Sequence, residues 1–267
     1  MSSCDIDERF GGIRRVYGDA GARLIRELHV CVVGLGGVGS WAVEALVRSG
    51  VGRLTLIDHD EVCLTNINRQ LHALTSTVGQ SKGAVLAARV ADINPDCAVT
   101  VIDDFLTLQT LEDYLARDYD YVLDAIDSIK FKAAMIAWCK RRKLPIVTTG
   151  GAGGMTDPGM IQVADLWKTY NDPLAAKVRA SLKKNHGFTT KPGRSFGVEC
   201  VFSSQQPVYP RADGTVSHEK PGIHGVSLDC RFGYGAASVV TPVFGFMAAS
   251  RVINRSLERA RRHHCHD

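Results

Sequence analysis

Glycines from Gly34 to Gly39 form the pattern GLGGVG directly after the apolar segment HVCVV. Glycine at these positions lets the backbone approach a phosphate, and a helix that follows adds free amides and the positive end of its dipole. Asp58 ends a second apolar segment, where a carboxylate can accept hydrogen bonds from ribose hydroxyls. The nucleotide-binding candidates in this part are Gly34, Gly36, Gly37, Gly39 and Asp58. This pattern fits NAD, FAD and ATP about equally.

The next loop, CLTNINRQ, and the segment QSKG carry amide and cationic side chains. A nicotinamide needs an apolar pocket, whereas a triphosphate needs several donors. Arginine suits two oxygens at once and lysine acts as a point charge. The candidates are Asn66, Arg69, Gln70 and Lys82. They favour ATP over a dinucleotide.

Asp127 follows a third apolar segment in LDAIDS, at the end of a strand where ligands collect in such folds. A carboxylate there can hold Mg²⁺, which keeps most of its waters and bridges phosphate oxygens. Alternatively, Asp127 is only the N-cap of the helix that follows. Asp124 is the weaker candidate for a metal ligand.

Alternating strand and helix patterns place these residues in an α/β fold. The expected strands are 29–34, 53–58, 98–103, 121–125 and 145–149, and the expected helices are 38–48, 82–93, 107–116 and 129–142. They predict a Rossmann-like, doubly wound, mostly parallel sheet. The second half predicts strands 160–166 and 197–203, helices 173–184 and 236–260, and otherwise mostly loop over 185–227. We expect a single domain over 1–267, with a nucleotide-binding core at about 20–165 and a C-terminal elaboration at about 166–267.

Charge and composition narrow the function further. The net charge is +4, but basic residues gather in two stretches, 168–194 and 251–262, which either follow a phosphate backbone or are solvated helix faces. The candidates for nucleic-acid contact are Lys183, Lys184, Lys191 and Arg194. The uncharged run 233–250 contains Pro242 and many small residues, so we expect a buried helix rather than a membrane span. The acidic N-terminus and eight scattered cysteines without a CxxC pair predict a cytoplasmic protein with reduced thiols.

Motifs in the first half resemble those of the ubiquitin-activating-enzyme-like adenylyltransferases, which include the enzymes that activate sulfur carriers for molybdopterin and thiamine synthesis. The matching segments are GLGGVGS (34–40), LIDHDEV (56–62), TNINRQ (65–70), VGQSK (78–82) and AIDS (125–128). Further segments are similar to the tRNA threonylcarbamoyladenosine dehydratase branch. These are RFGGIRRVYG (9–18), NRQLHAL (68–74), VTTGGAGG (147–154), DPLAAKVR (172–179), GVECVFS (197–203) and LDCRFGYGAA (228–237).

This resemblance implies a homodimer that uses ATP and Mg²⁺ to adenylate the carboxylate of threonylcarbamoyladenosine beside the tRNA anticodon. The nucleoside then closes to its cyclic form. The implied catalytic residues are Arg69, Lys82 and Asp127, with Asp127 holding Mg²⁺. In the family, the second of two N-terminal arginines reaches the nucleotide phosphates of the neighbouring subunit. Arg9 matches the first of these arginines and is a further candidate for contact with the nucleotide of a partner subunit.

The sequence also departs from the wider family. Relatives that bind zinc have paired CxxC motifs, which this chain lacks, so we expect no zinc. The second N-terminal arginine of the family is Gly12 here, with Arg14 or Arg15 as substitutes. Cys230 stands where sulfur-transferring relatives have a reactive cysteine, and it is either that nucleophile or a small buried thiol. The sequence leaves open whether a cysteine desulfurase or another sulfur-acceptor partner docks on the protein.

Two other function classes compete with the dehydratase. The same adenylation chemistry could act on the C-terminal glycine of a sulfur-carrier protein. A nicotinamide dehydrogenase, or a module that binds a nucleotide without turnover, would need the glycine pattern alone. The cationic loop and the basic stretches disfavour both.

Overall fold

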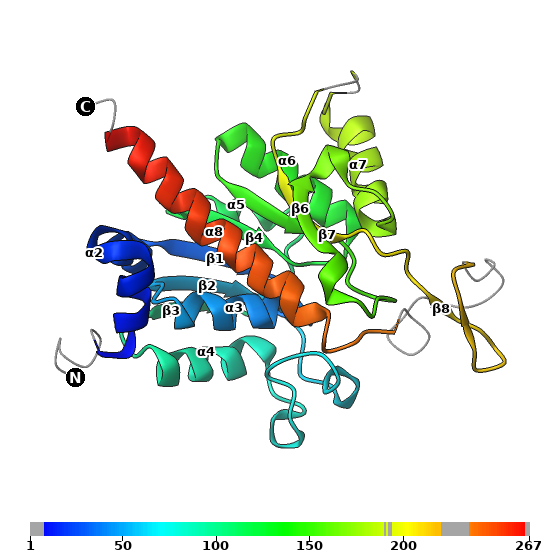
Figure 1. Ribbon diagram of the computed structural model, residues 1–267, viewed down its shortest axis with the longest axis horizontal. Coiled ribbons are helices and arrows are strands. Elements are labelled where there is room, and N and C mark those ends of the chain that lie inside the picture. The colour runs from blue at the N-terminus through cyan, green and yellow to red at the C-terminus, as the bar shows by residue number, and fades with distance from the viewer. Residues whose placement is uncertain (1–7, 190, 192–193, 220–234, 265–267) are drawn as a thin grey trace.

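The computed structural model describes residues 8–189, 191, 194–219 and 235–264. Within these residues the main sheet has seven strands: β1 (His29–Val33), β2 (Arg53–Ile57), β3 (Ala98–Ile102), β4 (Tyr121–Asp124), β5 (Ile146–Thr149), β6 (Ile161–Asp165) and β7 (Glu199–Ser203). Their order across the sheet is β3-β2-β1-β4-β5-β7-β6, and every pair is parallel except β6 with β7. The expected doubly wound, mostly parallel sheet is confirmed (Figure 1).

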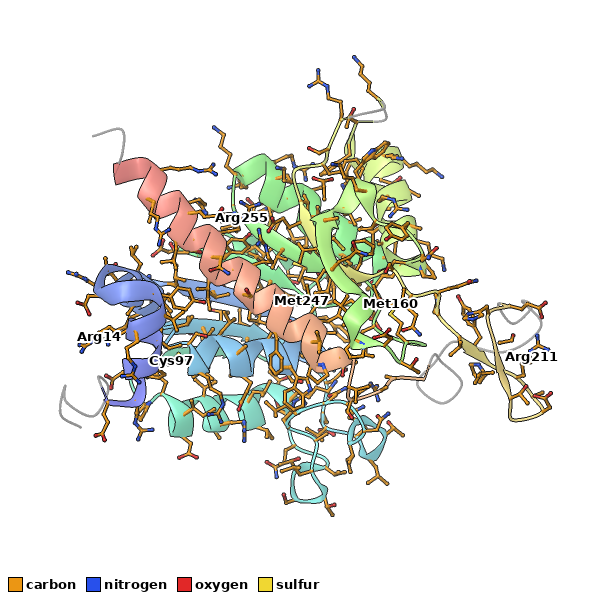
Figure 2. The ribbon with its side chains drawn as sticks, in the orientation of Figure 1. Arg14, Cys97, Met160, Arg211, Met247 and Arg255 are labelled. Atoms are coloured by element: carbon orange, nitrogen blue, oxygen red, sulfur yellow. The ribbon has the colours of Figure 1, made fainter. Side chains whose placement is uncertain are left out.

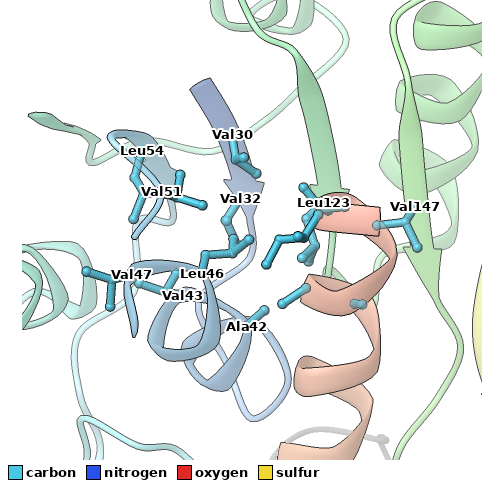
Figure 3. Packing of buried hydrophobic residues seen from close by; sticks show 14 of the residues in the cluster. Val30, Val32, Ala42, Val43, Leu46, Val47, Val51, Leu54, Leu123 and Val147 are labelled. Carbon is cyan, nitrogen blue, oxygen red and sulfur yellow. The ribbon is translucent and has the colours of Figure 1, made fainter. Parts of the chain in front are cut away.

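Helices cover both faces of this sheet. They are α2 (Gly11–Glu27), α3 (Gly39–Arg48), α4 (Lys82–Ile93), α5 (Leu111–Leu115), α6 (Ile129–Arg142), α7 (Pro173–His186) and α8 (Thr241–His264). Side chains of β1 alternate between the faces, so Val30 and Val32 pack in one core and Cys31 and Val33 in the other. The first core contains α3 and α8 side chains around β1 and β4 (Figure 3), and the second contains those of α5, α6 and α7.

Most expected elements are present, and the differences have local causes. Helices 82–93 and 129–142 match α4 and α6 residue for residue, whereas α5 is much shorter than the expected 107–116. The sequence did not predict α2, because Gly11, Gly12 and Gly18 interrupt its helical pattern. Gly18 has a φ of 74°, which marks a kink within this helix. A small hairpin of β8 (Tyr209–Pro210) and β9 (Val216–Ser217) was also missed within the expected loop 185–227.

Residues 241–250 of the apolar run 233–250 form the start of a helix that packs against the core, as expected. α8 begins at Thr241 rather than at 236, which places Pro242 in the first turn, where its missing N–H costs no hydrogen bond. α8 crosses the sheet beside α3 (Figure 1), and a β-carbon at Gly245 would lie 2.5 Å from the Val38 carbonyl oxygen. No helix in the described part of the chain is long and apolar enough to cross a bilayer.

The C-terminal basic stretch is largely used inside the fold. Arg251 and Arg255 both donate to the carboxylate of Glu199 at the start of β7, at 2.6–3.0 Å, and Arg255 also pairs with Glu258. Arg255 projects from α8 toward the strands behind it (Figure 2). Because these two guanidinium groups stabilise the packing of α8 on the sheet, the alternative in which this stretch follows a phosphate backbone does not hold for them.

Candidate nucleotide-binding site

The order of the strands creates a crevice between β1 and β4. β1 pairs with β2 on one side and with β4 on the other, so the chain connections leave in opposite directions at this point. In open α/β sheets, ligands bind at such a switch point beyond the carboxyl ends of the strands. Gly34 follows β1 and Ala125 follows β4, so the glycine loop and the Asp127 loop lie at this crevice.

The glycine loop, Gly34–Gly39, turns so tightly that side chains are excluded at both ends. Gly34 has a φ of 88°, and a β-carbon there would lie 2.9 Å from the Ala125 carbonyl carbon. A β-carbon at Gly39 would lie 1.7 Å from the Gly34 carbonyl oxygen. Both glycines are therefore required by backbone packing, which explains the first and last positions of the pattern.

Between these two positions the loop leaves backbone donors available. The amides of Gly36, Gly37 and Val38 donate to no other described residue, and Val38 caps α3 without a side-chain hydrogen bond. α3 has no acidic residue in its first turn. Free amides at the positive end of a helix favour an anion, so this loop is suited to bind a phosphate group.

Asp58 lies beside the glycine loop at the end of β2. Its Oδ2 accepts a hydrogen bond from the Leu35 amide at 2.5 Å, and its Oδ1 accepts one from the Asp60 amide at 2.9 Å. Each carboxylate oxygen keeps a further lone pair. Asp58 is thus fixed against the loop in a position that suits ribose hydroxyls.

Lys82 begins α4, and its ammonium group lies at the N-terminal end of that helix. It is buried and donates to Asp60 Oδ2 at 2.7 Å, while Ser81 caps the helix by accepting from the Ala84 amide. Asp60 is half exposed, so its carboxylate can leave the pair for water when a phosphate takes its place. The charge and the helix dipole both attract an anion here.

Arg69 and Gln70 line the opposite side of the glycine loop. Arg69 Cγ would lie 3.3 Å from a β-carbon at Gly37, and its Nη1 donates to the Thr65 carbonyl at 2.8 Å. Gln70 is buried, and its Oε1 has no hydrogen-bond partner in the described structure. An orphaned buried oxygen beside free amides and two cations fits a site built for a polar ligand.

Asn66 has a more local role than expected. It is buried, and its Oδ1 accepts from the Cys63 amide at 3.1 Å at the start of a short 3₁₀ turn, Leu64–Asn66. This bond shapes the loop that carries Arg69 and Gln70. The structure therefore assigns Asn66 a loop-forming contact, and its contact with a nucleotide remains a prediction.

Asp127 is exposed at the crevice and forms no hydrogen bond or ion pair with any described residue. α6 begins at Ile129 with Ser128 as its N-cap, so the alternative interpretation of Asp127 as that cap is wrong. Its carboxylate is free to hold Mg²⁺. Asp124, by contrast, is fully buried and bonded to Lys132 and Thr148, which excludes it from a solvated metal site.

Other candidate residues lie away from this crevice. Arg9 Nη1 donates to the Ile93 carbonyl at 3.3 Å, at the far end of α4 from Lys82, and a helix of that length spans about 17 Å. Arg9 therefore lies too far from this crevice to contact a nucleotide bound there. Lys183 and Lys184 lie at the C-terminal end of α7, also away from the crevice. Cys230 is outside the described residues.

Three charged or titratable residues at this site were missed by the sequence analysis. Asp60 pairs with Lys82, and Lys132 pairs with Asp124. His72 is buried with no partner for either ring nitrogen in the described structure, and burial together with the charge of Lys82 lowers its pKa to about 4. The sequence signal for Lys132 was a single lysine on the apolar side of an expected helix.

One group of possible metal ligands occurs among the described residues. Oxygen or nitrogen atoms of Asp58, His59 and Asp60 lie within 4.8 Å of one another. Asp58 and Asp60 already bond to the Leu35 amide and to Lys82. We therefore assign no ion to this group.

Taken together, the crevice offers free amides, a helix N-terminus, two cations and an unpaired carboxylate, which are the parts needed to bind a nucleoside triphosphate with Mg²⁺. The sequence pattern of the ThiF family matches residues 11–265. The chain belongs to the ThiF family.

Three relatives with known names or structures are similar to this chain. It is 52% identical to the tRNA threonylcarbamoyladenosine dehydratase of Escherichia coli (strain K12) over 96% of each chain. It matches the solved structure of E. coli TcdA in complex with ATP with a TM-score of 0.86 and 49% identity, over 96% of each chain. The molybdopterin-synthase adenylyltransferase of E. coli is 35% identical over 51% of this chain and 54% of that protein. The resemblance inferred from the motifs is confirmed.

Proposed function

We propose that the chain catalyses the ATP-dependent dehydration of threonylcarbamoyladenosine next to the tRNA anticodon. The observation that carries this proposal is a triphosphate-type crevice in a chain that is 52% identical, over nearly its whole length, to a dehydratase of that specificity. The carrier-activating relative matches only about half of the chain. The similarity to this adenylyltransferase supports a shared use of ATP for adenylation, and it does not favour a carrier protein as the substrate.

The reaction needs a leaving group on a carboxylate. The carboxylate oxygen of the nucleoside attacks the α-phosphorus of ATP, and pyrophosphate leaves. The carbamoyl group of the same nucleoside then attacks the activated carbonyl carbon, loses a proton and displaces AMP. One carboxylate oxygen departs with AMP, so the nucleoside loses the elements of water.

The chain contributes positioning and charge to these steps. The amides of Gly36 and Gly37 and the cations of Arg69 and Lys82 stabilise phosphate charge that grows as pyrophosphate leaves. Asp58 holds the ribose. Asp127 would hold Mg²⁺, which offsets negative charge on the phosphate oxygens when bound. Because the attacking group belongs to the substrate, we expect Cys230→Ala to retain most activity.

The RNA contacts we propose lie on the α6–α7 basic surface, defined here as Arg141, Lys143, Lys183, Lys184, Lys191 and Arg194. α6 and α7 pack side by side, and the charge of Arg141 contributes, after burial, to a lowered pKa of His186. The C-terminal ends of the two helices therefore meet. Lys183 also lies 4.0 Å from the centre of the Trp167 ring.

This surface lies at the opposite edge of the sheet from the crevice. Asp172 caps α7 and accepts from the Gly151 amide near the end of β5, whereas Lys183 and Lys184 lie in the last turn. α7 has 14 residues, so about 20 Å separates its two ends. A bound tRNA would have to extend along the protein by roughly that distance beyond the modified nucleoside.

We further propose a homodimer in the cytoplasm, where tRNA and ATP occur together. The position of Arg9 far from its own crevice supports a role in the partner's site. We also propose that residues 1–267 form one domain, with a nucleotide-binding core at about 20–165 and an RNA-binding part at about 166–267. We expect no zinc, and we make no proposal for a sulfur-acceptor partner.

The decisive experiment incubates the protein with ATP, Mg²⁺ and tRNA that carries threonylcarbamoyladenosine. We expect AMP and pyrophosphate to form and the nucleoside mass to fall by one water. The control replaces tRNA with a sulfur-carrier protein. Unchanged nucleoside together with carrier-dependent ATP–pyrophosphate exchange would support the adenylyltransferase instead.

A second experiment tests the basic surface. Lys183→Ala with Lys184→Ala should lower tRNA affinity and reduce the slope of log K against log salt by about 1.5, because each phosphate contact contributes roughly 0.7–0.9. A matched control is Arg48→Ala with Arg53→Ala, which removes two cations that pair with Glu44 and Asp118. Equal slopes in the two variants would remove this surface from RNA binding.

A further inference from the structure

Two charged side chains are sealed beneath the crevice. Asp124 is 0% exposed and Lys132 2% exposed, and Lys132 Nζ donates to Asp124 Oδ1 at 2.9 Å. Thr148 Oγ1 donates to the other carboxylate oxygen at 2.6 Å. Removing two charges from water is costly, and an apolar pair of the same volume is often as stable. The pair therefore calls for a reason beyond stability.

That reason lies in the second hydrogen bond of Lys132. Its Nζ also donates to the Ile126 carbonyl at 2.8 Å, in the loop that joins β4 to α6. The Ile126 amide in turn donates to Asp124 Oδ1 at 3.3 Å, and the Ala125 amide donates to the Val33 carbonyl at 2.9 Å. The pair thus holds both backbone polar groups of Ile126, the residue immediately before Asp127.

This loop touches the glycine loop closely. The Ala125 backbone is the group that a β-carbon at Gly34 would meet, and its side chain is 3.3 Å from where a β-carbon at Gly39 would lie. Asp127 itself is exposed and bonds to no described residue. Its position is therefore set by the backbone of Ala125 and Ile126, and not by any contact of its own carboxylate.

We propose that Lys132 is a positioning residue for Asp127. Through the Ile126 carbonyl it fixes the loop that carries this carboxylate over the phosphate-binding turn, and it does not touch the substrate. This inference rests on the proposed function in one respect, which is that Asp127 would hold Mg²⁺. The restraint on the loop is a property of the ligand-free protein.

The test compares Lys132→Met, which keeps most of the side-chain volume, with Lys132→Arg and with Lys130→Met. Lys130 is an exposed lysine at the start of the same helix and provides the control. Amide hydrogen exchange of residues 125–128 is measured without ligand. We expect exchange in Lys132→Met to rise roughly tenfold, as for the loss of one charge-assisted hydrogen bond. Lys132→Arg should restore part of the protection, and Lys130→Met should match the wild type.

Binding and turnover provide the second readout. Lys132→Met should require several-fold more Mg²⁺ for ATP binding measured by calorimetry. It should lower kcat, with little change in the KM for ATP at saturating Mg²⁺. Exchange and calorimetry need no tRNA, so a failure of the dehydratase proposal would not be mistaken for a failure of this one.

Loss of stability is separated from loss of positioning by Asp124→Asn with Lys132→Met. Together the two substitutions remove the buried carboxylate that Lys132→Met alone would leave unpaired. They still leave the Ile126 carbonyl without its ammonium donor. We expect stability to recover relative to Lys132→Met, while loop exchange stays fast and the Mg²⁺ requirement stays high. Wild-type loop exchange in Lys132→Met, or full recovery of both readouts in the double variant, would overturn the proposal.

Discussion

Two aspartate–lysine pairs lie at the same edge of the sheet and differ in their access to water. In the pair of Asp124 and Lys132, the side chains are 0% and 2% exposed. In the pair of Asp60 and Lys82, the lysine side chain is 5% exposed but the aspartate is 51% exposed. The first pair has no route for exchange with solvent ions. The second can separate, because water can solvate Asp60 while another anion takes its place on Lys82.

The difference indicates how one type of interaction serves two purposes. A sealed pair fixes its surroundings, since breaking it leaves a charge in an apolar interior. A half-exposed pair contributes little to stability but keeps a cation ready in the absence of a ligand. Burial raises the pKa of Asp124, while Lys132 and Thr148 act in the opposite direction. The partners of Asp124 are thus what offsets the cost of its burial.

The largest effect we predict is on stability. Asp124→Ala should lower the free energy of unfolding by about 3–5 kcal/mol, because Lys132 would remain buried without its carboxylate. Asp60→Ala should lower it by about 1 kcal/mol or less, since water can take the place of this half-exposed carboxylate beside the Lys82 ammonium group. Urea denaturation of both variants measures the difference. Similar losses in the two variants would show that exposure does not distinguish these pairs.

The next effect is on catalysis. Lys82→Ala should lower kcat/KM for ATP by about 10²–10³, the usual cost of removing one group that stabilises developing charge. Its stability should stay close to that of Asp60→Ala, because both variants break the same half-exposed pair. Initial rates at varied ATP, with urea denaturation alongside, test this expectation. A rate within a few-fold of the wild type would exclude Lys82 from the phosphate-binding machinery.

The sequence predicted the parts of this site that depend on local chain geometry. The turn of Gly34 to Gly39, Asp58 at the end of a strand and Lys82 at the start of a helix all follow from patterns within a few residues. Even the bounds of α4 and α6 were predicted. Such features are set by backbone sterics and helix signals, which a single sequence displays directly.

Features that need distant segments to meet were missed. Asp60 and Lys82 are separated by 22 positions, and they pair only because the end of β2 and the start of α4 lie at the same edge of the sheet. Lys132 lies on the apolar side of α6, which indicates burial, but the sequence does not show that its partner is Asp124 on the preceding strand. The arginines 251 and 255 were interpreted as a basic surface because Glu199, their shared partner, lies on another element.

A smaller effect concerns pH, through a neighbour of Lys82. Burial and the charge of Lys82 lower the pKa of His72 from 6.5 to about 4 in the folded chain. Below pH 6.5 the unfolded chain binds a proton that the folded chain does not, so stability is full above pH 6.5 and falls as the pH drops toward 4. The shift corresponds to about 3 kcal/mol. Urea denaturation of His72→Gln across this range should show a flatter profile than the wild type, and parallel profiles would contradict the buried neutral state of His72.

The smallest effect is on ATP affinity and follows from the half-exposed pair. Asp60→Asn should tighten ATP binding by about fivefold, since Lys82 no longer has to leave a carboxylate that also repels the triphosphate, and such exposed pairs are worth up to about 1 kcal/mol. Calorimetry at fixed Mg²⁺ measures the ATP affinity. Glu61→Gln is the control, because it makes the same charge change at the neighbouring exposed acidic residue. Weaker binding in Asp60→Asn alone would mean that this carboxylate helps to hold the nucleotide or its metal ion. The pair would then be part of the bound state rather than a contact that the ligand replaces.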